Sequence, residues 1–246
     1  MSRLSAYLGP PVALDYVLPD FAGGLEQQGY NFGIGWYAPD GSPAVYTHPI
    51  PICLDANLPH LARSLTSGLW LFQTSGVAAL ASVSHPVVQP FLDDDFIFVH
   101  QGYIEDFRTA LYPTMPHFLS PEIEAQMYGR GEAEYLFALL RHLLADDEEM
   151  SIDQAMFEMF ALLDDWLGGL AAYLNIIVSD GEGLYAARHA INAECAPLYY
   201  NTDDEIFPNA QLIAGEPLTQ SGFWQPVPEH HILILSADEP PELLAL

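Results

Sequence analysis

Two helices with clear end signals are predicted in the middle of the chain, and strand-like segments in both outer thirds. The first helix is expected over Glu132 to Ala145, where leucines recur on one face. The second is expected from Ser151, which forms a capping box with Gln154, to about Leu167, before a glycine pair. The order strands, two helices, strands predicts an α+β fold with one continuous core, a single domain over residues 1–246.

Turn residues divide the outer segments into short apolar runs that are typical of strands. A strand from residue 3 is expected to stop at Gly9-Pro10-Pro11, and a short helix is expected over Asp55–Leu65. Asp93–Asp95 is expected to be a solvated turn, and Asp180–Gly183 a hairpin turn. The expected strands cover residues 3–8, 32–38, 44–47, 70–74, 96–100, 171–179, 184–189, 198–200, 211–214 and 231–235.

The charge of the chain excludes two classes of partner. It has 33 acidic residues and 6 basic ones, all arginine, for a net charge of −27. Such a surface repels nucleic acid and anionic membranes, so we expect neither partner. Half of the residues are hydrophobic and only 16% are charged, which indicates a folded chain rather than a disordered one. The acidity has two interpretations, which are solubility, favoured here, and docking to a basic protein partner.

No metal, cofactor or export signal is evident. Cys53 and Cys195 are expected to be small buried hydrophobic residues, and His230 and His231 would point to opposite faces of a strand. The chain has no phosphate-binding glycine loop, dinucleotide fingerprint or Gly-x-Ser-x-Gly elbow. Its first residues do not resemble a signal peptide, and no apolar run is long enough to span a membrane. We therefore expect a cytoplasmic protein without metal or cofactor.

Ser2 is unusual because of its position. A small second residue permits removal of the initiator Met, which would give Ser2 a free α-amine. That amine, with a pKa of about 7.7 to 8.0, can accept the hydroxyl proton and activate the nucleophile. Serine is also a frequent second residue in proteins that are not enzymes, so Ser2 alone does not indicate catalysis.

The order of several motifs resembles the class II glutamine amidotransferases, which are N-terminal-nucleophile hydrolases. The likeness extends over nearly the full length and is greatest to the stand-alone γ-glutamyl hydrolases of ergothioneine pathways. It implies a four-layer αββα sandwich with two antiparallel sheets between helix layers. The residues that carry it are Met1-Ser2-Arg3 with Ala6–Gly9, Gln28–Tyr37, Phe98–Gly102, Val178–Gly181 and Ala214–Leu218.

The resemblance also implies where a glutamine site would lie, and several residues there depart from the family pattern. The nucleophile position holds Ser2 in place of Cys, and the oxyanion position holds Gln101 in place of Asn, followed by the family's Gly102. The position of the arginine that binds the substrate carboxylate holds Gln73, within a segment that continues to Thr74. Two further positions matter for the substrate: the aspartate that binds its amine is replaced by Glu132, while Arg3 is retained.

These departures leave three hypotheses. The favoured one is a degenerate amidotransferase-like protein that acts as a binding or regulatory subunit, paired with a basic protein or an active relative. The second is a Ser2-dependent hydrolase of a γ-glutamyl or other small amide, with an altered substrate. The third, an ordinary glutaminase with an engineered Ser2, leaves Gln73 and Gln101 unexplained.

Overall fold

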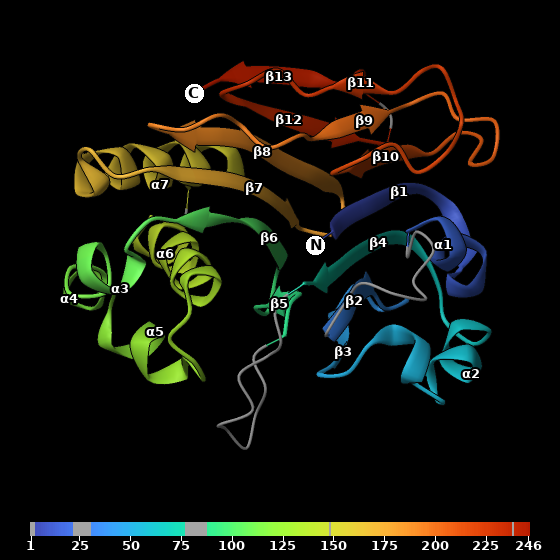
Figure 1. The fold of residues 1–246 in the computed structure, drawn as a ribbon. Helices are drawn as coiled ribbons and strands as arrows, with labels where there is room; N and C mark the ends of the chain where they lie inside the picture. Colours follow the sequence, from blue (N-terminus) through green and yellow to red (C-terminus); the bar gives the residue numbers. More distant parts are fainter. Residues whose placement is uncertain (1–2, 22–30, 77–87, 148, 238) are drawn as a thin grey trace.

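The structure, a computed structural model, describes residues 3–21, 31–76, 88–147, 149–237 and 239–246. Within these residues two antiparallel sheets form the centre of the molecule (Figure 1). None of the helices in the described ranges has the length and apolar character that crossing a membrane requires.

The larger sheet has seven strands in the order β11-β9-β10-β1-β4-β2-β3. Strand β1 lies inside the sheet, between a strand from the first third of the chain and one from near its end, and it begins in the middle of the molecule (Figure 1). The strands are β1 (Arg3–Ala13), β2 (Asn31–Tyr37), β3 (Pro43–His48), β4 (Thr66–Ser75), β9 (Tyr199–Asn201), β10 (Gln211–Ala214) and β11 (Gln225–Pro226).

The smaller sheet has six strands in the order β13-β12-β8-β7-β6-β5. Its long central strands β6, β7 and β8 pair in continuous register, with Gln101 opposite Asn175 and Gly102 opposite Leu174. The strands are β5 (Phe91–Leu92), β6 (Ile97–Ile104), β7 (Ala172–Ser179), β8 (Gly183–Ile191), β12 (His231–Ser236) and β13 (Glu242–Ala245).

Helices cover the outer face of each sheet. The smaller sheet is covered by α3 (Phe107–Ala110), α4 (Met115–Phe118), α5 (Pro121–Gln126), α6 (Glu132–Asp146) and α7 (Ile152–Leu167), and the larger by α1 (Leu14–Phe21), the 3₁₀ turn η1 (Ile52–Leu54) and α2 (Leu58–Ala62) (Figure 1).

Three buried apolar clusters fill the spaces between these layers. They form because alternate residues of each strand point to opposite faces of its sheet, and each face packs against another layer. One cluster lies between the two sheets and includes Leu71 of β4 and Val99 of β6. The second lies between the smaller sheet and its helices, and the third between the larger sheet and its helices. The expected α+β, αββα sandwich is confirmed.

Two elements, β1 and α2, differ in length from what the sequence predicts. Strand β1 continues through Pro10 and Pro11 because its pairing with β4 is interrupted between Leu8 and Val12, where no ladder hydrogen bond is needed from either proline. The helix expected over Asp55–Leu65 is only α2, although Asp55 Oδ1 does accept the backbone N–H of Leu58, at 3.2 Å.

One further expectation about side chains is wrong, and another holds only in part, because Asp94 and Asp95 are exposed but Asp93 is not fully so. Cys53 is exposed rather than buried, and Cys195 is partly exposed. Asp93 is not simply solvated, because its carboxylate forms an ion pair with Arg141 of α6. The expected capping box at Ser151 is confirmed, since the Ser151 N–H donates to Gln154 Oε1 at 3.1 Å.

Candidate functional site

A cavity of about 340 Å³ opens where β1 begins, and strands of both sheets contribute to its lining. Arg3 and Gln101 both line it, which brings together two of the predicted site residues from strands in different sheets. Other walls come from the end of α1, from the loop before β9 and from the segment after β10. The lining residues are Arg3, Leu4, Asp20, Phe21, Gln101, Ala196, Pro197, Tyr199, Ala214, Gly215, Glu216, Pro217 and Leu218.

Gln101 points into the space between the sheets, on the same face of β6 as Val99. A Cβ atom at Gly215 would lie 3.2 Å from Gln101 Oε1, so the missing side chain at Gly215 gives the glutamine its room. Opposite Gln101, the buried Asn175 donates from Nδ2 to the carbonyl of Pro197 at 2.8 Å. The side chain of residue 101 is thereby placed at the wall of the cavity.

Gly102 has a steric reason to be glycine. A Cβ atom there would lie 2.2 Å from the Tyr173 carbonyl oxygen and 2.4 Å from His100 Nε2. His100 is buried, and burial lowers its pKa to about 3, so its ring is neutral at pH 7. The conformation of the strand at Gly102 therefore depends on close packing with His100.

Arg3 forms an ion pair with Glu216, with 2.7 Å between Nη2 and Oε1. Glu216 belongs to the segment Ala214–Leu218, one of the five motifs that carry the sequence resemblance. Asp20, at the end of α1, adds a second carboxyl group to the cavity. Its pKa is raised by burial and by the nearby Asp204. The described lining thus holds two carboxyl groups and one guanidinium, which is already paired with a carboxylate.

Gln73 and Thr74 lie on β4 but do not line this cavity. Both are buried, and Gln73 pairs in register with Leu4 while Thr74 pairs with Arg3. Gln73 shares the face of β4 that carries Leu71, so it points between the sheets. Among the described residues its Oε1 atom has no hydrogen-bond partner, and Asn175 Oδ1 is in the same condition. The space between the sheets therefore holds buried amide oxygens that lack a donor among the described residues, those of Gln73 and Asn175 among them.

Glu132 lies apart from the cavity, at the first turn of α6. Its Oε2 atom accepts the backbone N–H of Ile104 at 3.2 Å. Burial raises its pKa to about 7, and the hydrogen bond from Ile104 partly opposes that shift. Ser2 and residues 28–30 of the early motif lie outside the described residues.

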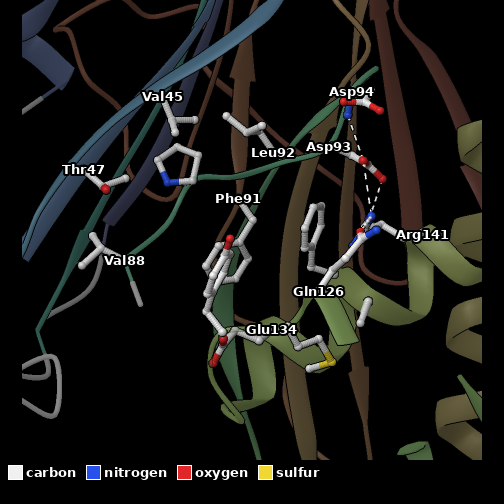
Figure 2. Close-up of a pocket in the computed structure, with 15 residues that line it drawn as sticks. Val45, Thr47, Val88, Phe91, Leu92, Asp93, Asp94, Gln126, Glu134 and Arg141 are labelled. Atoms are coloured by element: carbon white, nitrogen blue, oxygen red, sulfur yellow. Dashed lines mark hydrogen bonds and ion pairs between the residues drawn. The ribbon is translucent and has the colours of Figure 1, made fainter. Parts of the chain in front are cut away.

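A second, larger cavity of about 640 Å³ lies between β3 and α6 (Figure 2). Val45 and Thr47 of β3 form one wall, and Glu134 and Arg141 of α6 lie on the other side (Figure 2). None of the predicted site residues lines it. We therefore place the candidate site in the smaller cavity.

The sequence analysis did not predict several residues that line the smaller cavity. Asp20, Ala196 and Pro197 lie in a helix or loops whose place in the fold is set by tertiary packing, and no motif marks them. Asn175 lies in a predicted strand, and alternation along that strand could have placed it on the same face as Ile177.

Solved structures with the same fold come from class II glutamine amidotransferase proteins. A glutamine aminotransferase class-II domain protein from Silicibacter pomeroyi superposes with a TM-score of 0.72 at 24% identity, covering 99% of this chain and 100% of its own. A predicted glutamine amidotransferase from Pseudomonas aeruginosa gives 0.59 at 17% identity, with full coverage of both chains. The glutamine phosphoribosylpyrophosphate amidotransferase of Bacillus subtilis gives 0.69 at 11% identity, and this chain spans 49% of its length.

No protein-family model and no curated protein sequence matches the chain. At these identities the structural likeness defines the fold. The chain has the class II glutamine amidotransferase fold, an N-terminal-nucleophile hydrolase sandwich, as the sequence resemblance implied.

Proposed function

We propose that this chain is a class II glutamine amidotransferase-like protein that no longer hydrolyses glutamine and acts as a binding or regulatory subunit. One observation carries the proposal: the cavity offers no uncommitted cation among its described lining residues to bind the α-carboxylate of glutamine. The resemblance implies an arginine at position 73, and this chain has Gln73. Arg3 is paired with Glu216. A neutral amide cannot replace the bidentate pair between an arginine and a carboxylate.

The rest of the site favours a ligand rich in hydrogen-bond donors. Asp20 and Glu216 are carboxyl groups on the cavity wall, and Glu216 is paired with Arg3. A carboxyl group can accept a hydrogen bond from an amide or amine, whereas a carboxylate on the ligand would be repelled by a carboxylate on the wall. The proposed ligand is therefore an amide or amine without a free carboxylate.

Ammonia release from glutamine tests the proposal directly. Intact-mass spectrometry first establishes whether Met1 has been removed. We expect no glutamine turnover above the buffer control, and none after Ser2→Cys, because a better nucleophile does not restore substrate binding. Ammonia release from glutamine that disappears in Ser2→Ala would overturn the proposal.

The second candidate is a Ser2-dependent amidohydrolase that acts on a γ-glutamyl or other small amide. It is supported by the position of Arg3, the residue after Ser2, in the same cavity as Gln101, whose amide can donate to an oxyanion. The longer side chain shifts that donor, and losing one oxyanion donor costs about 2.7–4 kcal/mol. Turnover of a γ-glutamyl amide other than glutamine, or of another small amide, abolished by Ser2→Ala, would favour this candidate. Retained Met1 would exclude it.

The proposed partner is a basic protein or an active relative of this chain. The net charge of −27 supports a basic surface on that partner, because opposite charges speed encounter and select among partners. Affinity purification at low and high salt, followed by mass spectrometry, tests this point. We expect a partner that dissociates as salt rises, and a complex insensitive to salt would contradict a charge-driven interaction.

A further inference from the structure

Three side chains that can ligate a metal ion meet at one end of β8 and β12, outside the candidate site. Cys195 lies in the loop after β8, and Glu229 and His230 lie in the turn before β12. One ligand atom from each lies within 4.8 Å of the other two. We propose that Cys195, Glu229 and His230 bind a divalent transition metal ion, with Zn²⁺ as the best chemical match.

This site was not predicted because the sequence argument considered His230 and His231 as neighbours on one strand. In the structure β12 begins at His231, and His230 lies in the preceding turn with a positive φ of 57°. The residues that could share a metal ion with His230 are therefore those of its own turn and of the loop after β8. The rule that adjacent strand residues point to opposite faces does not apply to His230.

The backbone around the site is held in place by Arg188 of β8. Its Nε donates to the carbonyl of Ala196 at 2.8 Å, and its Nη1 donates to the carbonyl of Val227 at 2.7 Å. Its own carbonyl accepts the N–H of His230 at 2.8 Å. One side chain thus ties together both segments that supply ligands, which reduces the conformational cost of binding.

His189 orients the ring of His230. The two Nδ1 atoms are 3.3 Å apart and the rings are nearly perpendicular. His189 also packs on Phe160. It can share one hydrogen bond with His230 Nδ1, which leaves Nε2 of His230 to bind the metal. Such a contact from the far ring nitrogen is the usual support of a metal-bound histidine.

The donor set matches zinc. Zinc accepts sulfur, imidazole nitrogen and carboxylate oxygen at about 2.0–2.3 Å in a tetrahedral arrangement. Bonds of that length place ligand atoms about 3.4–3.6 Å apart, so rotations of the exposed Glu229 and His230 side chains can close the present separations. Three protein ligands leave the fourth position for water.

Binding exchanges a proton for the metal. The Cys195 thiol loses its proton to solvent as its sulfur forms the bond to zinc. The Arg188 guanidinium, 3.3 Å from Glu229 Oε1, competes with the metal for that carboxylate.

The metal would also act on the candidate site. Ala196 and Pro197 follow Cys195 directly and line the 340 Å³ cavity. Pro197 accepts the hydrogen bond from Asn175, which lies opposite Gln101. A bound ion would thus fix one wall of the cavity.

Cobalt titration tests the site, because a thiolate bound to Co²⁺ absorbs in the near ultraviolet and exposed carboxylates do not. We expect one Co²⁺ per chain with this absorption, lost when Zn²⁺ is added. Cys195→Ser should abolish the band and His230→Ala should weaken binding at least tenfold. His189→Ala, a change at the positioning residue, should weaken it about 10–100-fold. Cys53→Ser in η1 and His60→Ala in α2, both at exposed positions, are the matched controls and should leave it unchanged.

A second readout does not depend on any variant folding correctly. Zn²⁺ should protect Cys195, but not Cys53, from alkylation in the unaltered protein, as read by peptide mass spectrometry. The proposal is overturned if the band is absent, if it persists in Cys195→Ser, if it needs Cys53, or if Zn²⁺ leaves alkylation of Cys195 unchanged. Binding without a thiolate band would show only cations held by the acidic surface.

Discussion

Gly102 shows how closely one position can be constrained. Adding a methyl group in Gly102→Ala would place a carbon against the Tyr173 carbonyl and the His100 ring at distances that atoms do not adopt. The neighbouring strand or the buried ring must therefore move. We expect a loss of about 1–3 kcal/mol in the free energy of unfolding, as in other overpacked sites, measured by urea denaturation.

Gly169→Ala is the matched control for that substitution. A Cβ atom at Gly169 meets no atom within 4 Å, and its φ is not in the left-handed range. This variant should be as stable as the original protein or slightly more stable, because alanine restricts the unfolded chain. Equal stability of the two variants would show that packing at Gly102 is not limiting.

Glu132 makes the stability of the fold depend on pH. Its pKa of about 7 in the folded protein exceeds the ordinary 4.5, so the folded state binds the proton more tightly than the unfolded state does. The contribution of this group to stability is therefore complete below about pH 4.5 and is lost as pH rises through about 7. Since a pKa unit corresponds to about 1.4 kcal/mol and partial solvation weakens the effect, about 1–3 kcal/mol is at stake.

Glu132→Gln should remove this pH dependence. The amide oxygen can still accept the Ile104 N–H, and no charge has to be buried at high pH. Urea unfolding at pH 5 and pH 8 should show a smaller loss of stability on raising pH in the variant than in the original protein. Exposed Glu122→Gln is the control, and an unchanged pH dependence in Glu132→Gln would contradict the assignment.

At the scale of elements, one ion pair connects α6 to the β5–β6 turn at the wall of the larger cavity (Figure 2). The side chains of Arg141 and Asp93 are 14% and 28% exposed, so the pair is less screened than a surface pair. We expect Arg141→Met to cost about 1–2 kcal/mol, since Asp93 loses a charged hydrogen-bond donor.

A double-mutant cycle with Asp93→Asn separates this interaction from other effects of each change. The coupling should be near 1 kcal/mol, above that of most exposed pairs. Arg63→Met removes an exposed arginine and should change stability by no more than about 0.5 kcal/mol. A coupling of zero would mean that the contact does not hold α6 in place.

The elements that sequence reasoning predicted are those with local signals. Helices α6 and α7 have apolar periodicity and capping residues, and the long strands are apolar runs between turns. Helix α1 was missed because Pro19 lies inside it, and α3 and α4 are four residues each, too short for a periodic signal. Tertiary packing specifies these elements more than their own sequence does.

The candidate site was also predictable only in part, because tertiary packing brings several of its residues together. The resemblance named Arg3 and Gln101, and both line one cavity. It also named Gln73 and Thr74, which the structure places in buried positions next to that cavity's first strand. The carboxyl group of Asp20 and the ligand cluster around Cys195 arise from segments far apart in the chain, so no local pattern reports them.

For the molecule as a whole, self-repulsion follows from a net charge of −27. Raising NaCl from about 0.01 M to about 1 M shortens the screening length from about 30 Å to about 3 Å. We therefore expect the thermal midpoint at pH 7 to rise with NaCl. At pH 4.5, where many carboxylates are protonated, the rise should be smaller, and an equal rise would indicate that salt acts by another route.

The place of β1 within the larger sheet has a consequence for synthesis. Ser5 pairs with Ala214, and their separation along the chain is 214 − 5 = 209 residues. At about 5–20 residues per second, the ribosome makes the second partner of β1 roughly 10–40 s after the strand itself. Throughout that time one edge of β1, beside the future cavity, has no neighbouring strand, so the sheet cannot close around β1 until β10 has been synthesised.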